Sequence, residues 1–95
     1  MTDPIDEQLP GADLIRTGLD DVRHGRESIE ALLVLIGAPR LRRIGIDVPE
    51  RAIARPEHRL YELLARSDGD SAHGRYNALI RRLVSFERAA ECVRR

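Results

Sequence analysis

The segment from residue 26 to residue 45 constrains the fold of this chain more than any other. Its centre, residues 31–38, is a run of eight residues that are apolar apart from one glycine. A helix formed by this run is apolar on every side, so we expect it to be the buried centre of the fold. A buried β-strand is the alternative, because the run is short and ends in Gly-Ala-Pro. Leucine outnumbers the β-branched residues, which favours the helix.

Pro39 and Gly45 determine how this helix ends. Proline has no amide hydrogen to donate to the preceding turn, so we expect Pro39 to break or kink the helix. Residues 40–44 then add one further turn. Gly45 closes that turn, because glycine adopts the positive φ of a helix end at little cost.

An apolar stripe at helical spacing precedes the central segment. It consists of Leu14, Ile15, Leu19 and Val22. The stripe predicts a helix that starts near Gly11 and ends before Gly25. Gly18 lies inside the pattern, where a glycine costs about 1 kcal/mol relative to alanine.

Residues 46–55 are expected to connect the two halves of the chain, and a third helix follows. Pro56 suits the first position of that helix, and Glu57 in its first turn complements the helix dipole. We expect this helix to run to about Arg66. Residues 67–70, Ser-Asp-Gly-Asp, are typical of a turn.

The last helix has the most regular pattern, with six apolar positions that alternate by three and four. They are Tyr76, Leu79, Leu83, Phe86, Ala90 and Val93. Together these segments predict an all-α fold, a small antiparallel four-helix bundle with a central second helix kinked at Pro39 and a long C-terminal helix. Residues 11–95 are expected to form this single helical domain, and residues 1–10 a flexible acidic tail.

The length of the last helix suggests self-association. Roughly 24 residues at 1.5 Å each make a rod of about 36 Å, whereas a compact domain of this size is about 32 Å across. Soluble monomers tend to avoid an exposed apolar strip at a helix end. We therefore expect a homodimer whose interface includes Phe86, Ala90 and Val93.

Composition excludes several classes of protein. The apolar run is far shorter than the roughly 20 residues of a transmembrane helix, and the acidic first ten residues do not resemble a secretory or transit signal. We therefore expect a cytoplasmic protein that does not contact a membrane. The single cysteine, Cys92, excludes an intramolecular disulfide, and no Cys/His spacing matches a zinc site. We expect no metal and no cofactor.

Charge is distributed unevenly, although 16 acidic and 16 basic residues cancel. Residues 1–30 carry eight acids and three arginines, whereas residues 31–95 carry eight acids and thirteen arginines. Candidate contacts to nucleic-acid phosphates are Arg42, Arg43, Arg75 and Arg82. The alternatives are a solvated face interleaved with acids such as Glu87 and Glu91, or a docking face for the acidic tail. Every basic residue is arginine, which a GC-rich genome produces without any role in nucleic-acid binding.

A polar cluster near the start of the last helix is a second candidate site. Gly74 lies within the first turns of that helix, and such a conflict with helix propensity is typical of close packing or of function. Under the packing interpretation, Gly74 lets another helix approach. Under the functional interpretation, a polar pocket is formed by His58, His73, Arg75 and Asn77.

No catalytic residue is identified. The sequence has no GxSxG, no Gly-rich phosphate loop with lysine and no HExxH. We therefore expect a small helical protein-interaction module of the adaptor, antitoxin or regulatory-subunit kind, which self-associates and binds an unidentified protein partner. The alternatives are a helical nucleic-acid-binding domain and a small RNase-like hydrolase.

Overall fold

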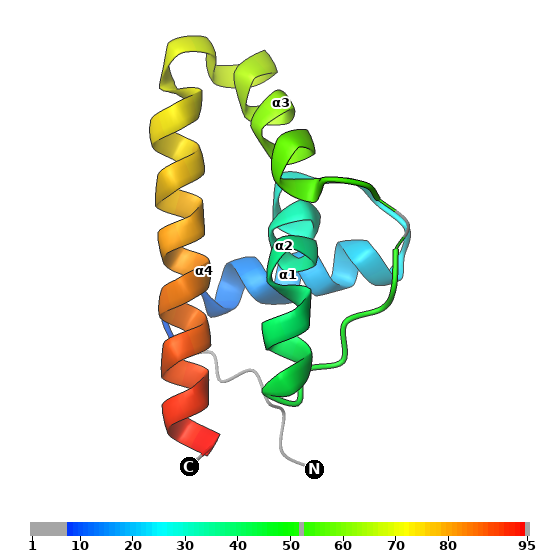
Figure 1. Cartoon of the computed structure of the whole chain (residues 1–95), viewed down its shortest axis with the longest axis vertical. Helices are drawn as coiled ribbons and strands as arrows, with labels where there is room; N and C mark the ends of the chain where they lie inside the picture. Colours follow the sequence, from blue (N-terminus) through cyan, green and yellow to red (C-terminus); the bar gives the residue numbers. More distant parts are fainter. Residues whose placement is uncertain (1–7, 52, 95) are drawn as a thin grey trace.

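The computed structural model describes residues 8–51 and 53–94, and every regular element in these ranges is helical (Figure 1). The elements are α1 (Ala12–Arg23), α2 (Ile29–Arg43), α3 (Pro56–Asp68), a 3-10 turn (Gly69–Ser71) and α4 (Ala72–Arg94). The all-α class is therefore confirmed. Residues 1–7 of the expected acidic tail lie outside the described residues.

The expected antiparallel four-helix bundle is not supported. In the described part of the chain, only α2, α3 and α4 run along the long axis, and α1 lies across them (Figure 1). α4 passes along both α3 and α2, which lie nearly end to end (Figure 1). The molecule measures 41 × 25 × 18 Å. Apolar spacing predicts which residues of a helix are buried, but it does not fix the angle at which two helices cross, and this explains the difference.

α2 is the central helix, as its sequence predicts. It packs against α1, α3 and α4. The largest fully buried side chains come from all four helices: Ile15, Leu19, Leu32, Leu33, Val34, Leu41, Leu60, Leu64 and Phe86. None of the described helices is long and apolar enough to cross a membrane.

Gly18 determines how closely α1 approaches α2. A Cβ added at Gly18 would lie 2.3 Å from the backbone oxygen of Glu30 and 2.5 Å from Cγ2 of Val34. Only glycine leaves room for this contact. The residue that lowers the helix propensity of α1 is therefore the one that lets α1 cross α2.

Both glycines expected at helix ends take that role. Gly25 has a φ of 71° and Gly45 a φ of 101°. After α1, the backbone amide of Arg26 donates to the backbone oxygen of Asp21 at 2.8 Å. After α2, the amide of Ile46 donates to the backbone oxygen of Leu41 at 3.0 Å. These six-to-one bonds are those of the Schellman motif, which satisfies carbonyls left open at a helix end.

α2 continues through Pro39 and ends at Arg43, so the proline does not end the helix. Pro39 is exposed. The kink expected at Pro39 stays a prediction. Pro56 occupies the start of α3, as expected.

Candidate functional site

An open groove of about 550 Å³ lies between α2, the connecting segment (residues 44–55) and the start of α3. We call it the α2 groove. Its apolar lining consists of Leu35, Ala38, Pro39, Ile53 and Pro56, and its polar lining of Arg42, Glu50 and Arg51. The lining residues from α2 are three, one and three positions apart, so they form one stripe of the helix.

This stripe faces away from α4. Gly37 lies on the opposite side of α2, where an added Cβ would be 2.8 Å from Cδ1 of Leu83. Arg40 also reaches α4, and its Nε lies 2.6 Å from Oε1 of Glu91. The α2 groove and α4 therefore lie on opposite sides of α2.

The connecting segment forms a fixed wall of the groove. Ile44, Ile46 and Val48 alternate with exposed residues, and their side chains are buried in the core. The guanidinium of Arg42 holds the same segment, because Nε and Nη2 donate to the backbone oxygen of Val48 at 3.1 and 2.9 Å. Arg42 thus lines the groove and fixes its wall.

The segment enters α3 through an unusual backbone conformation. Arg55 has a φ of 56° and a ψ of 60°, in the left-handed region that favours glycine. This conformation costs roughly 1–2 kcal/mol for a residue with a Cβ. It redirects the chain directly before Pro56, which lines the groove.

Several arginines bridge separate elements of the fold. Arg59 of α3 bonds Glu27 at 2.7 Å, and Arg82 of α4 bonds Asp13 of α1 at 3.2 Å. At the end of α1, the guanidinium of Arg26 bonds the carboxylates of Asp20 and Asp21. Arg59 and Arg82 thus join separate elements of the fold, a role that suits the planar donor fork of the guanidinium.

The structure does not gather the four arginines nominated for nucleic acid into one patch. Arg75 pairs with Asp68 near the start of α4, and Arg82 pairs with Asp13. Arg42 and Arg43 lie at the far end of α2, where Arg42 bonds a backbone oxygen. Three of the four guanidinium groups thus already bond groups of the chain itself.

The residues nominated for a polar pocket are also separated. His58 lies in the first turn of α3, with Nε2 2.9 Å from Oε1 of Glu62. His73 lies in the first turn of α4, and its Nε2 is 3.2 Å from Nδ2 of Asn77. Arg75 pairs with Asp68. Only His73 and Asn77 come together, on an exposed surface.

Gly74 does not admit another helix. A Cβ added there would meet nothing within 4 Å outside its own neighbourhood in the helix, so the packing interpretation is wrong. His73 instead joins an aromatic cluster. The ring of Tyr61 lies 6.4 Å from that of His73 and 5.8 Å from that of Tyr76.

The residues nominated for a dimer interface are mostly inside the chain. Phe86 is 0% and Ala90 2% exposed, because both pack in the core, and only Val93 is exposed, at 66%. A fully buried side chain cannot contact a second copy. An interface built on Phe86 and Ala90 therefore does not fit this fold.

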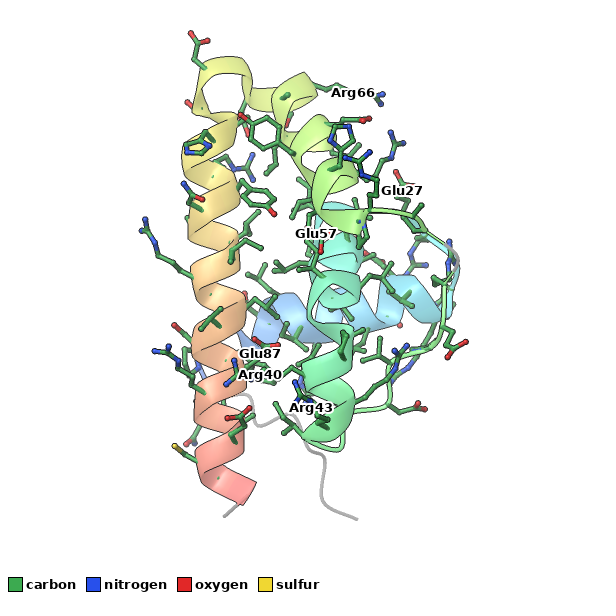
Figure 2. The ribbon with its side chains drawn as sticks, in the orientation of Figure 1. Glu27, Arg40, Arg43, Glu57, Arg66 and Glu87 are labelled. Carbon is green, nitrogen blue, oxygen red and sulfur yellow. The ribbon has the colours of Figure 1, made fainter. Side chains whose placement is uncertain are left out.

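Glu87 is a buried acid that the sequence reasoning placed on a solvated face. Its side chain lies between α4 and α2 and points toward Arg40 (Figure 2). Oε1 of Glu87 lies 3.6 Å from Nη1 of Arg40. Burial raises the pKa of the Glu87 carboxyl, while the charge of Arg40 opposes the shift. Its spacing of four from Leu83 and three from Ala90 places it on the buried face, and this signal was present in the sequence.

Within the described ranges, no three metal-ligating side chains lie close enough together to hold an ion. No family model, curated protein or solved structure matches this chain.

Proposed function

We propose that this chain is a helical protein-interaction module and that its α2 groove binds an extended segment with an apolar side chain flanked by carboxylates. The observation that carries this proposal is the composition of the groove, an apolar floor bordered by two arginines. Its volume of about 550 Å³ lies in the range that proteins use for ligand pockets, roughly 300–1,000 Å³.

The floor supports the apolar part of the segment. Leu35 and Ile53 are partly exposed and present aliphatic surface, and a side chain that covers this surface is removed from water. Burial of one leucine or isoleucine side chain contributes about 1.5–3 kcal/mol. The wall is held by Arg42, so little ordering of the groove is required before binding.

The charges on the rim support the carboxylates. Among the described residues, no acidic group pairs with Arg51, nor with Arg55 beside the groove, whereas Arg26, Arg40 and Arg59 each bond an acid. A guanidinium that is not already paired can bind a carboxylate through two parallel hydrogen bonds. Glu50 also lines the groove and opposes an acidic ligand.

Nucleic-acid binding is the weaker alternative. It needs several free cations on one surface, and two of the four nominated arginines, Arg75 and Arg82, are already paired with carboxylates of the chain itself. The RNase-like alternative has no support from geometry, because His58 contacts Glu62 and His73 contacts Asn77, and among the described residues no hydrogen bond joins the two histidines.

The proposal is tested with a labelled peptide that has one leucine between two pairs of glutamates, measured by fluorescence anisotropy. We expect binding that weakens when the leucine is replaced by serine or the glutamates by lysine. Arg51→Glu should weaken binding by about three- to ten-fold, as expected for the reversal of an exposed charge.

Arg81→Glu is the matched control, because Arg81 is an exposed arginine on α4, on the other side of α2. Its affinity for the peptide should equal that of the wild-type chain. No binding, or equal losses in Arg51→Glu and Arg81→Glu, would refute the proposal. Tight binding of a single-stranded RNA with a steep dependence on salt would favour the nucleic-acid alternative instead.

A further inference from the structure

We infer that the α2 groove of one copy binds residues 3–7 of a second copy of this chain, an inference that rests on the function proposed above. These residues read Asp-Pro-Ile-Asp-Glu. They place one aliphatic side chain, Ile5, among three carboxylates within five positions. This is the chemistry that the groove is suited to bind.

The two sets of charges are complementary. The segment carries Asp3, Asp6 and Glu7, while the groove has Arg42 and Arg51 in its lining and only one acid, Glu50. Ile5 would cover the aliphatic floor, and the flanking carboxylates would reach the guanidinium groups at the rim. A proline has little freedom in φ, so its presence at position 4 reduces the conformational entropy that this segment can lose on binding.

The position of α1 explains why the segment comes from a second copy. α1 begins against α4, where an added Cβ at Gly11 would lie 3.0 Å from the backbone oxygen of Arg82. It ends at the groove, where a Cβ at Gly25 would lie 3.2 Å from Nη1 of Arg51. The two ends are about 20 Å apart at 1.5 Å per residue (Figure 1).

The segment of the same copy is too short to cross this distance and also to occupy the groove. Leu9 packs against the core, so the chain leaves the fold on the α4 side of the molecule. The six residues 3–8 span about 20 Å when fully extended. They would only just reach the Arg51 end of the groove of their own copy, where α1 ends, and none would be left to lie along it.

A second copy removes this restriction. Each copy has one segment and one groove, so a two-fold pair can fill both grooves by exchange of residues 3–7. The buried Phe86 and Ala90 take no part in such a pair, so this dimer differs from the one expected on the last helix.

Two variants of the full chain test the inference by complementation. Ile5→Ser disables the segment and keeps the groove, whereas Arg51→Glu disables the groove and keeps the segment. In sedimentation velocity, the dissociation constant of Ile5→Ser should rise at least about ten-fold, since burial of one isoleucine corresponds to that factor. That of Arg51→Glu should rise by about ten-fold, because both grooves of the pair lose a charge. An equimolar mixture should form more dimer than either variant alone, because the mixed pair keeps one intact exchange and collects both substitutions in the other, and an exchange already lost to one substitution is not weakened further by the second.

Two further variants serve as controls. Arg81→Glu should dimerise like the wild-type chain, and Glu50→Gln should dimerise more tightly, since an acid that repels the segment is removed. Circular dichroism melts that match the wild-type melt show that each variant is folded.

The outcomes separate this inference from the function on which it rests. The inference is overturned if the wild-type chain is a monomer at high micromolar concentration, or if the mixture dimerises no better than its components. In either case, binding of the glutamate-leucine peptide to the groove would leave the proposed function standing. If neither that peptide nor a second copy binds, both fail.

Discussion

Glu87 of α4 lies against the backbone of Gly37 of α2, and an added Cβ at Gly37 would be 3.1 Å from Oε2 of Glu87. The carboxylate thus occupies the space that a side chain at residue 37 would fill. It is 4% exposed, and its neighbour Arg40 belongs to the same helix as Gly37. A glycine that looks unfavourable within α2 therefore makes room for the charged group between α2 and α4.

We expect Glu87→Gln to change how stability depends on pH. Burial raises the pKa of Glu87 in the folded state, with opposition from the charge of Arg40. A raised acid pKa contributes stability that is fully present below the unfolded pKa, about 4.3, and is lost as the pH rises through the folded value. The variant lacks this loss, so its stability relative to the wild-type chain should increase from pH 4 to pH 7. Urea unfolding at several pH values measures the difference in the free energy of unfolding between the two chains. A difference that does not change with pH would contradict the prediction.

We expect Asp21→Asn to show the opposite dependence on pH. Hydrogen bonds from the Ser28 hydroxyl, at 2.6 Å, and from Arg26, at 2.8 Å, lower the pKa of Asp21. A lowered acid pKa contributes stability that is present above the unfolded pKa and is lost as the pH falls through the folded value. The variant should therefore be less stable than the wild-type chain at pH 7, and the gap should narrow below pH 4. Thermal melts across this range test it, with Asp70→Asn, an exposed acid, as the control.

We expect two glycine-to-alanine changes to have opposite signs. Gly18→Ala places a Cβ 2.3 Å from a backbone oxygen, so α1 must move away from α2. It should lower the free energy of unfolding by about 2 kcal/mol or more. Gly74→Ala meets nothing within 4 Å and should raise it by about 0.5–1 kcal/mol through helix propensity. Chemical denaturation measures both. A neutral Gly18→Ala would show that the close crossing of α1 over α2 is not present in solution.

We expect Arg42→Lys to loosen the wall of the groove without changing the charge. A lysine has a single ammonium group and cannot reproduce the two donors that bond the Val48 oxygen. The loss of such a bond lowers the stability of the segment by about 0.5–1.5 kcal/mol. Hydrogen exchange in residues 44–55 should therefore become several-fold faster, while Arg81→Lys leaves it unchanged. Equal hydrogen-exchange rates in the wild-type chain and both variants would show that Arg42 does not hold the segment through the Val48 oxygen.

Local features of the sequence predicted three helix boundaries, whereas α3 runs two residues past its expected end at Arg66. Gly25, Gly45 and Pro56 act within one turn of their own positions, and all three take the expected roles. The crossing of α1 over α2 depends on contacts between Gly18 and residues of another helix, and helical spacing within α1 does not encode those contacts.

The candidate site was missed for a similar reason. The wall of the α2 groove is made by residues 44–55, which carry no long element and read as a simple connection. Arg42 holds these residues through its bonds to the backbone oxygen of Val48. Because every residue has a backbone carbonyl group, the sequence does not indicate which one an arginine will bond. The arginine therefore looked like a free cation.

The order in which the helices pack bears on how fast this chain folds. α1 packs on α2, α2 on α3 and α3 on α4, so most contacts join helices that are neighbours along the chain. Short connections close at a small entropic cost, and helical domains of this kind reach the native state in microseconds to milliseconds. The contacts of α4 with α2, where Glu87 is buried, and with α1, where Arg82 bonds Asp13, join segments that are much further apart along the chain. We therefore expect the Glu87 carboxylate to be buried late in folding, so that Glu87→Gln changes the unfolding rate more than the folding rate.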